Sequence, residues 1–118
     1  MSEGLSGVFS IPDELELLEF FCADPVERSV EDGYWCYEVT DRRGVRLRLS
    51  FNLFERSVQT ALQVMDSPLI TVSHEGAESM TVAGQTMTCR FSYKGSDARL
   101  VLRLGDSIQL DWSSLRKE

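Results

Sequence analysis

The stretch Val-Arg-Leu-Arg-Leu-Ser-Phe-Asn-Leu at positions 45–53 alternates between apolar and polar side chains along its whole length. Successive side chains of a β-strand point to opposite faces, so this pattern gathers the apolar residues on one face and the polar residues on the other. One face buried and one face solvated is typical of an antiparallel sheet. The pattern therefore predicts a half-buried strand whose core side carries Val45, Leu47, Leu49, Phe51 and Leu53.

Similar segments continue on both sides of this strand. The segment Tyr34 to Thr40 is rich in aromatic and β-branched residues, and the glycine-containing turn Asp41–Gly44 joins it to the strand at 45–53. Further strands are predicted at 58–65, 69–74, 80–83, 87–93, 98–104 and 108–112. Residues 58–65 also fit a short helix, although their alternation and the lack of a cap favour a strand. Residues 69–74 and 80–83 are expected to pair around a turn at Glu75-Gly76.

Residues Ser10 to Ala23 have helical rather than alternating periodicity. Ser10 is the expected N-cap, with Pro12 in the first turn, and Asp24-Pro25 ends the segment. The apolar stripe expected to pack on the sheet consists of Ile11, Leu15, Leu18 and Cys22, widened by Leu17 and Phe21. The predicted fold class is therefore α+β, with a meandering antiparallel sheet of about six to eight strands and one amphipathic N-terminal helix.

Length and composition favour one domain that spans residues 1–118, with frayed ends at 1–7 and 116–118. The longest apolar runs fall short of the roughly 20 residues that cross a bilayer, and the start of the chain lacks the pattern of a secretory signal. We therefore expect a cytoplasmic location. The three cysteines, Cys22, Cys36 and Cys89, are widely spaced and are expected to act as small buried hydrophobes.

Negative charge is concentrated at the N-terminal end of the chain. The net charge is −7, and residues 1–32 hold nine acids and one arginine, a local balance of −8. Such a field repels nucleic acids and anionic membranes, and it attracts basic proteins while speeding their encounter. We therefore expect a basic protein partner, with neither nucleic acid nor membrane bound.

Residues capable of catalysis are few and scattered in this sequence. His74 is the only histidine, and neither a paired-cysteine motif nor a phosphate-binding loop is present. Ser73, His74 and Glu75 resemble a catalytic triad in composition, but neighbours on a strand point to opposite faces and cannot converge. We therefore predict binding rather than catalysis, with no catalytic residues, metal ligands or cofactors.

Two groups of charged residues stand out as candidate binding surfaces. The first is an acidic group around the predicted helix, interpreted either as a solvated face or as a docking site for a basic partner: Asp13, Glu14, Glu16, Glu19, Asp24 and Glu27. The second is a group of arginines on the polar side of the predicted strands: Arg46, Arg48, Arg90, Arg99 and Arg103. These arginines either pair with acids across strands or form a basic face for an acidic ligand or subunit.

Three features together resemble a known family. They are an acidic N-terminal helix, an antiparallel sheet that ends in the apolar strand Ile108–Trp112, and the lack of a set of catalytic residues. The chain is similar to the bacterial immunity proteins of contact-dependent growth inhibition and other polymorphic toxin systems. The resemblance implies a stoichiometric inhibitor of a toxin domain, for which a nuclease is one candidate. A small-molecule carrier built on a β-barrel and a structural or oligomeric interaction module are the alternatives, and both a monomer and a homodimer are compatible with the sequence.

Overall fold

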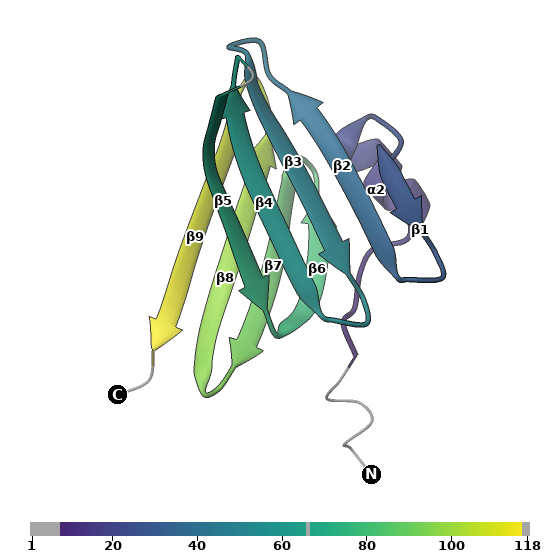
Figure 1. Ribbon diagram of the computed structural model, residues 1–118, viewed down its shortest axis with the longest axis vertical. Helices are drawn as coiled ribbons and strands as arrows, with labels where there is room; N and C mark the ends of the chain where they lie inside the picture. The colour runs from purple at the N-terminus through teal and green to yellow at the C-terminus, as the bar shows by residue number, and fades with distance from the viewer. Residues whose placement is uncertain (1–7, 66, 117–118) are drawn as a thin grey trace.

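The computed structural model describes residues 8–65 and 67–116, which form one helix and nine strands in two antiparallel sheets (Figure 1). The first sheet has the order β1-β2-β3-β4-β5 and the second the order β6-β7-β8-β9. The elements are α2 (Glu14–Phe21), β1 (Glu27–Ser29), β2 (Tyr34–Thr40), β3 (Val45–Asn52), β4 (Ser57–Val64), β5 (Ser67–Glu75), β6 (Ala77–Ala83), β7 (Thr86–Tyr93), β8 (Ser96–Leu104) and β9 (Ile108–Arg116).

The predicted α+β class with meandering antiparallel strands is confirmed, and residues 58–65 fall in a strand, β4, rather than in a helix. The described residues form nine strands where about six to eight were expected, and these strands divide between two meanders. The short strand β1 lies between the predicted helix and the strand at 34–40, where no strand was predicted. The predicted frayed ends at 1–7 and 117–118 lie outside the described residues, whereas Arg116 ends β9.

The two sheets are connected at Gly76, where the sequence predicted a hairpin turn. β5 and β6 belong to different sheets and do not pair with each other, so that prediction is wrong. Gly76 has a φ of +77°, and a Cβ atom added there would lie 2.3 Å from the carbonyl oxygen of Ser92. The amide of Ser92 donates a hydrogen bond of 2.9 Å to the carbonyl of Gly76. Only glycine fits this crossing, because β7 approaches it so closely.

The hydrophobic core fills the space between the sheets. As the alternation predicted, Leu47, Leu49 and Phe51 of β3 are buried, and residues of the second sheet such as Met80 and Leu102 meet them in one cluster. Each fully buried side chain of this size contributes roughly 1.5 to 3 kcal/mol to stability. Burial of these alternate positions therefore holds the two sheets face to face.

The cysteines are only partly as expected. Cys36 and Cys89 are buried, whereas Cys22 is exposed at the C-cap of α2 in the left-handed conformation. All three are free thiols. Burial raises the pKa of the Cys89 thiol to about 12. The buried cysteines thus act as small apolar residues, and the expectation for Cys22 was wrong.

Polar contacts also link the sheets directly. The indole nitrogen of Trp112 on β9 donates to the hydroxyl of Thr60, a fully buried residue of β4, over 3.2 Å. At the end of β2, the carboxylate of Asp41 accepts hydrogen bonds from the backbone amides of Ile108 and Val45, each at 3.0 Å. These hydrogen bonds, together with those from Arg43, lower the pKa of Asp41 to about 2. Asp41 is therefore ionised and fastens the β2–β3 turn to the start of β9.

The helix is shorter than predicted and presents a different face to the core. It begins after the N-cap Asp13, whose carboxylate accepts from the amide of Glu16 at 2.8 Å, while Glu16 reaches back to the amide of Asp13 at 3.0 Å. Ser10, the expected N-cap, instead bridges to Ser79 of β6. No helix in the described part of the chain is long and apolar enough to cross a bilayer.

The buried face of α2 consists of Leu17, Phe20 and Phe21. The ring of Phe21 stacks on that of Tyr37 in β2, with 4.4 Å between the ring centroids. Of the predicted stripe, Leu17 and Phe21 are buried and Ile11 packs against the core, whereas Leu15, Leu18 and Cys22 face solvent. Two phenylalanines bury more apolar area than the alternative stripe, which explains the orientation of the helix.

Candidate functional site

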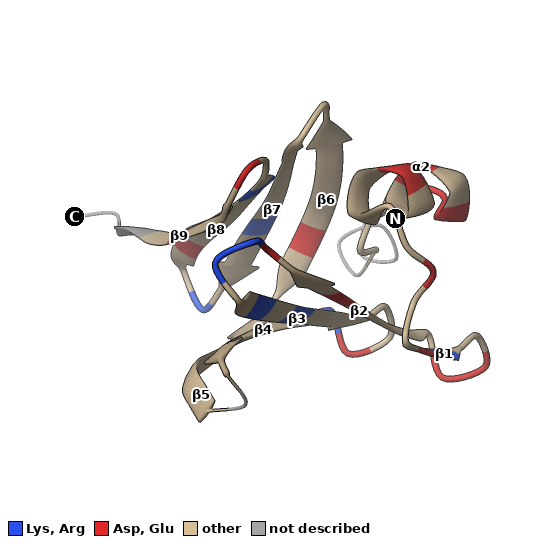
Figure 2. Cartoon of the chain, turned by 90° about the horizontal axis from the view of Figure 1, so that it is seen from above, with Lys and Arg blue, Asp and Glu red and all other residues tan. Residues whose placement is uncertain are grey.

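Acidic residues cluster around α2, the connection from α2 to β1, and β1 itself (Figure 2). We call this region the acidic helix surface; it contains the six predicted residues Asp13, Glu14, Glu16, Glu19, Asp24 and Glu27, together with the exposed Leu15 and Leu18. Five of these acids lie on α2 or in the connection after it, whereas the Glu27 carboxylate lies on the opposite face of β2 from α2, where it contacts Tyr34 and Arg48. Their individual environments differ, and only some of them are free to meet a partner.

Asp13 and Glu16 have a structural role within the surface. Each accepts a hydrogen bond from the other's backbone amide, which satisfies two of the donors that the first turn of a helix leaves open. This capping box explains why acids occupy these positions without any partner protein. Their negative charges also interact favourably with the N-terminal end of the helix.

Glu14 and Glu27 are held by arginines. Glu14 Oε2 accepts from the indole nitrogen of Trp35 at 2.9 Å and from Arg28 Nη1 at 3.1 Å, which ties α2 to β1 and β2. Glu27 Oε1 lies 3.2 Å from Arg48 Nη2. Both ion pairs are largely solvent-exposed, so each contributes at most about 1 kcal/mol to stability. These contacts orient the carboxylates and neutralise part of their charge.

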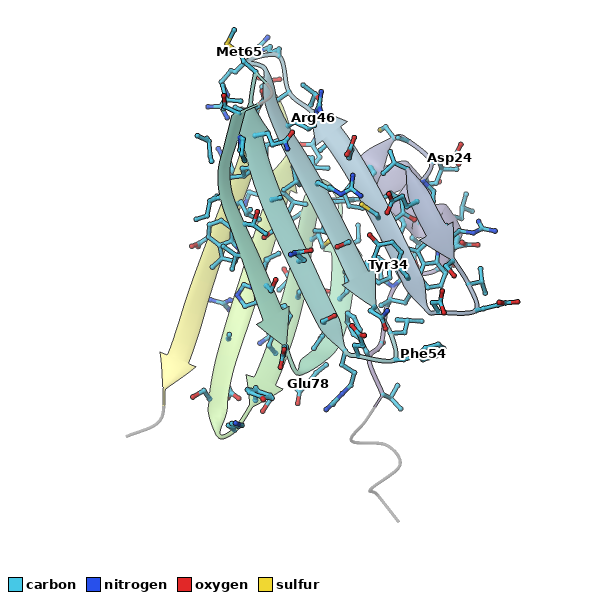
Figure 3. All side chains as sticks on the ribbon, viewed as in Figure 1. Asp24, Tyr34, Arg46, Phe54, Met65 and Glu78 are labelled. Carbon is cyan, nitrogen blue, oxygen red and sulfur yellow. The ribbon has the colours of Figure 1, made fainter. Side chains whose placement is uncertain are left out.

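Glu19 and Asp24 are different, because their carboxylates have no hydrogen bond or ion pair with any described residue. Both side chains are exposed: Asp24 lies in the connection that follows α2 (Figure 3), and Glu19 lies near the C-terminal end of α2. A negative charge near the C-terminal end of a helix is unfavourable because the carbonyl groups there are also negative. Glu19 and Asp24 are therefore the members of the group best placed to bind a cation.

Two leucines lie among these acids. Leu15 is 62% exposed and Leu18 is 39% exposed on the outer side of α2. Between the helix and the β1 region they border a hollow of about 230 Å³, which Asp24, Arg28 and Tyr37 also line. Exposed apolar side chains surrounded by charges are typical of a protein-binding surface. The sequence interpretation missed the leucines because it assigned them to the core.

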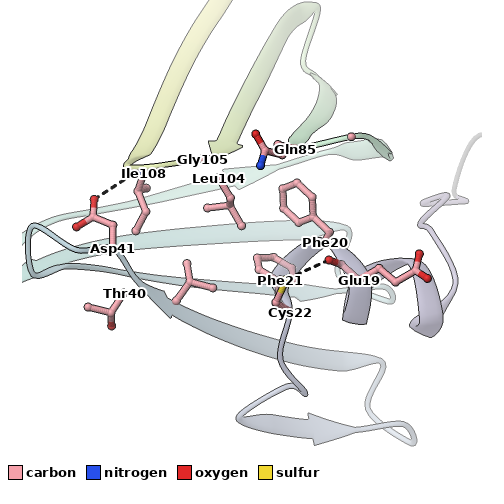
Figure 4. A pocket seen from close by; sticks show the side chains of 12 residues that line it. Glu19, Phe20, Phe21, Cys22, Thr40, Asp41, Gln85, Leu104, Gly105 and Ile108 are labelled. Carbon is pink, nitrogen blue, oxygen red and sulfur yellow. Dashed lines mark hydrogen bonds between the residues drawn. The ribbon is translucent and has the colours of Figure 1, made fainter.

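A larger cavity, about 410 Å³, opens at the other end of α2 (Figure 4). Its apolar wall includes Phe20, Leu104 and Ile108, and Glu19 lies on its rim. The carboxylate of Asp41 also borders it but is already engaged with Ile108. The cavity is open to solvent and lies outside the packed core. The carrier alternative required a closed barrel around an apolar chamber, whereas the described strands form two separate sheets with a filled interior.

The arginine group does not form one face. Arg46 and Arg48 belong to β3 in the first sheet, whereas Arg90, Arg99 and Arg103 belong to β7 and β8 in the second. Arg48 pairs with Glu38 at 2.8 Å and with Glu27, as the cross-strand interpretation predicted. The other four make no ion pair with a described residue. Arg90 and Arg99 are direct register partners on neighbouring strands.

His74 packs against an aromatic ring of the second sheet. Its ring stacks on Phe91 with 4.7 Å between the ring centroids, and burial lowers its pKa. Nδ1 is buried without a hydrogen-bond partner among the described groups. Across residues 8–65 and 67–116, the structure places no group of three or more histidine, cysteine or acidic side chains where it could hold a metal ion. His74 is thus a half-buried residue of β5 that packs against Phe91 of the second sheet.

Comparison with solved structures gives a strong match in fold. A chain from "Contact-dependent growth inhibition toxin - immunity protein complex from Klebsiella pneumoniae 342" matches with a TM-score of 0.81 at 20% sequence identity, covering 92% of this chain and 98% of that chain. No protein-family model matches the sequence, and no curated protein matches it. The expected resemblance is thereby confirmed at the level of the fold: this chain is folded like a chain of a contact-dependent growth inhibition toxin–immunity protein complex.

Proposed function

We propose that this chain is an immunity protein that binds a cognate toxin domain and neutralises it by stoichiometric association. The observation that carries the proposal is the fold match, which extends over almost the whole of a chain in a toxin–immunity protein complex. The surface chemistry supports it, because exposed acids surround the exposed Leu15 and Leu18 on α2. In this role the protein acts by covering the toxin.

The acidic helix surface is the proposed toxin-binding site. Interfaces commonly combine a desolvated apolar centre with a polar rim, and a few central residues carry most of the binding energy. Leu15 and Leu18 supply the apolar centre here, while Glu19 and Asp24 supply unpaired charges at its rim. Glu14 and Glu27 add carboxylates that their arginine partners hold in fixed positions.

The charge of this surface indicates the chemistry of the partner. Acids with no internal partner attract a basic protein and accelerate its association. A nuclease fits well, because an enzyme that binds the phosphate backbone presents a basic surface that carboxylates can cover. We place the complex in the cytoplasm, where the nucleic acid substrates of such a toxin lie.

The proposal is tested with the toxin domain encoded next to the gene for this chain. We expect the chain to restore growth of cells that express this domain, and isothermal titration calorimetry of the two purified proteins to show one-to-one binding. Replacing Leu15 and Leu18 together with alanine should weaken binding at least about tenfold, because truncation of central apolar residues costs about 1 kcal/mol or more each. Tyr93→Ala, at an exposed aromatic residue in another part of the molecule, is the matched control.

Association kinetics test the role of the charges. The double change Glu19→Lys and Asp24→Lys should slow association with the toxin and flatten its dependence on salt. Electrostatic steering accounts for factors of about 10 or more in association rate constants. Glu55→Lys with Asp97→Lys changes the net charge equally at exposed acids outside the surface, and it should have a smaller effect. Failure of the wild-type chain to bind or protect against the neighbouring toxin, or the absence of a toxin gene beside its own, would refute the proposed function.

A further inference from the structure

Strand β5 has one open edge. It pairs with β4 along one side and ends the first sheet, so its other side carries no strand among the described residues. The unpaired backbone groups of such an edge readily pair with another chain unless charges, proline or a covering segment protect them. β5 lies at the opposite edge of the sheet from β1 and the acidic helix surface (Figure 1).

Charged side chains or a covering segment protect the other sheet edges, whereas β5 has only Pro68 and the register shift at Leu69, both at its start. β1 has three residues and carries Glu27 and Arg28. β6 is partly covered by the segment at Ser10, which donates to the carbonyl of Glu78 and accepts from the amide of Met80. β9 carries Asp111 along its length. In β5, by contrast, residues 67–73 hold no charge at all, although the net charge of the chain is −7.

Apolar side chains are exposed along the same edge. Leu69 is 64% exposed and Ile70 is 44% exposed, while Met65 at the preceding turn is 86% exposed (Figure 3). These residues lie next to the open backbone of β5. Pairing of another strand with β5 would therefore bury apolar surface as well as satisfy backbone hydrogen bonds.

The lack of charge identifies the occupant as a second copy of this chain. Two identical strands that pair about a two-fold axis place like residues near each other, so any charge close to the axis would meet itself. A neutral edge on an acidic chain avoids this repulsion. A basic partner, in contrast, would be recognised by acids, and residues 67–73 have none.

We propose that two copies associate through antiparallel pairing of β5 with β5, with the two-fold axis at Thr71. This register sets Leu69 opposite Ser73 and Ile70 opposite Val72, with the two Thr71 residues facing each other. It also keeps Glu75 of one copy away from Glu75 of the other. Leu69 is the extra residue of β5 where the pairing with β4 shifts register. Pro68, whose nitrogen cannot donate a backbone hydrogen bond, lies outside the proposed pairing at the start of the strand.

The pairing leaves the acidic helix surface of both copies open, so it does not depend on the proposed toxin binding. If both interactions occur, two toxin domains bind one dimer. Because the test below contains no toxin, its failure would leave the proposed function intact. Failure of toxin binding would equally leave the dimer intact.

The test is the mass of the purified full chain, measured by sedimentation equilibrium at increasing protein concentration. We expect a concentration-dependent shift from the single-chain mass of 13.4 kDa to twice that value. Thr71→Lys brings two positive charges together at the axis and should abolish the shift. Thr81→Lys, the same change at an exposed residue of β6, should leave it unchanged. Circular dichroism and thermal unfolding establish that both variants remain folded.

A cysteine cross-link tests the register independently. In a Cys22→Ser background, which removes the exposed thiol, Thr71→Cys should form a disulfide-linked dimer on mild oxidation, whereas Thr81→Cys should not. A single-chain mass at every concentration would overturn the proposal. A dimer that persists in Thr71→Lys, or that gives no cross-link at Thr71, would overturn the β5 pairing.

Discussion

Substitution of Gly76 by alanine tests the connection between the two sheets most sharply. An alanine at a φ of +77° adopts the left-handed conformation at a cost of about 1 to 2 kcal/mol. Its Cβ would also lie 2.3 Å from the carbonyl oxygen of Ser92, so the backbone of β7 must move away. Forcing an extra carbon into a packed site costs roughly 1 to 3 kcal/mol. The two effects together predict a loss of about 2 to 5 kcal/mol in the free energy of unfolding.

Gly44→Ala is the matched control, because Gly44 has a φ of +86° but no atom within 4 Å of the added Cβ. It should lose only the conformational cost of about 1 to 2 kcal/mol. Urea unfolding followed by circular dichroism measures both variants against the wild type. Equal losses at the two positions would refute the reasoning, since the close approach of Ser92 would then contribute nothing.

Other predictions concern contacts within and between the sheets. Thr60→Val removes the acceptor for the indole of Trp112 and should lower the free energy of unfolding by about 1 kcal/mol in urea titrations, and its loss combined with Trp112→Phe should be smaller than the sum of the two single losses. The pKa of Asp41 is lowered to about 2 in the folded chain. Its contribution to stability is therefore full above the unfolded pKa near 3.9 and disappears as the pH falls toward 2. Asp41→Asn should flatten this part of the curve of unfolding free energy against pH. Asp13→Ala should cost about 1 kcal/mol of stability, while Asp13→Asn, which keeps the cap, should cost little in the same thermal unfolding assay.

The strands could be predicted because each buries one face. The alternation at 45–53 located β3 and named Leu47, Leu49 and Phe51 as core residues, and their burial confirms it. The same logic identified β4, where Val58 and Thr60 are fully buried. Alternation describes a single strand, however, and does not say which strands share a sheet. The division into two sheets was missed for this reason.

The crossing at Gly76 shows what sequence patterns lack. Glu75-Gly76 has the composition of a hairpin turn, and a positive φ at glycine suits that turn equally well. What separates the two possibilities is the contact with Ser92, a residue distant in sequence. Only the packing of one sheet on the other brings that residue to Gly76.

The orientation of the helix was predicted only in part, with Leu17 and Phe21 correctly buried, because eight residues allow two apolar stripes. Leu15 and Leu18 fit one stripe, and Leu17, Phe20 and Phe21 fit the other. The capping signal at Ser10 placed the helix start too early, whereas the true cap at Asp13 carries the full reciprocal pair with Glu16. The aromatic stripe buries more area and therefore faces the core.

The acidic group was found from charge density, which does not depend on the helix orientation. Its apolar centre was missed because Leu15 and Leu18 were assigned to the core. Sequence patterns also could not separate the capping acids Asp13 and Glu16 from the unpaired Glu19. That distinction depends on hydrogen bonds that only the folded chain shows.

Hydrogen–deuterium exchange of this chain with and without its cognate toxin domain tests the central claim most directly. The account predicts that toxin binding slows exchange in α2 and in the segment from Cys22 to β1, and leaves β7 and β8 unchanged. Slowed exchange confined to the second sheet, with α2 unaffected, would contradict the assignment of the acidic helix surface as the toxin-binding site.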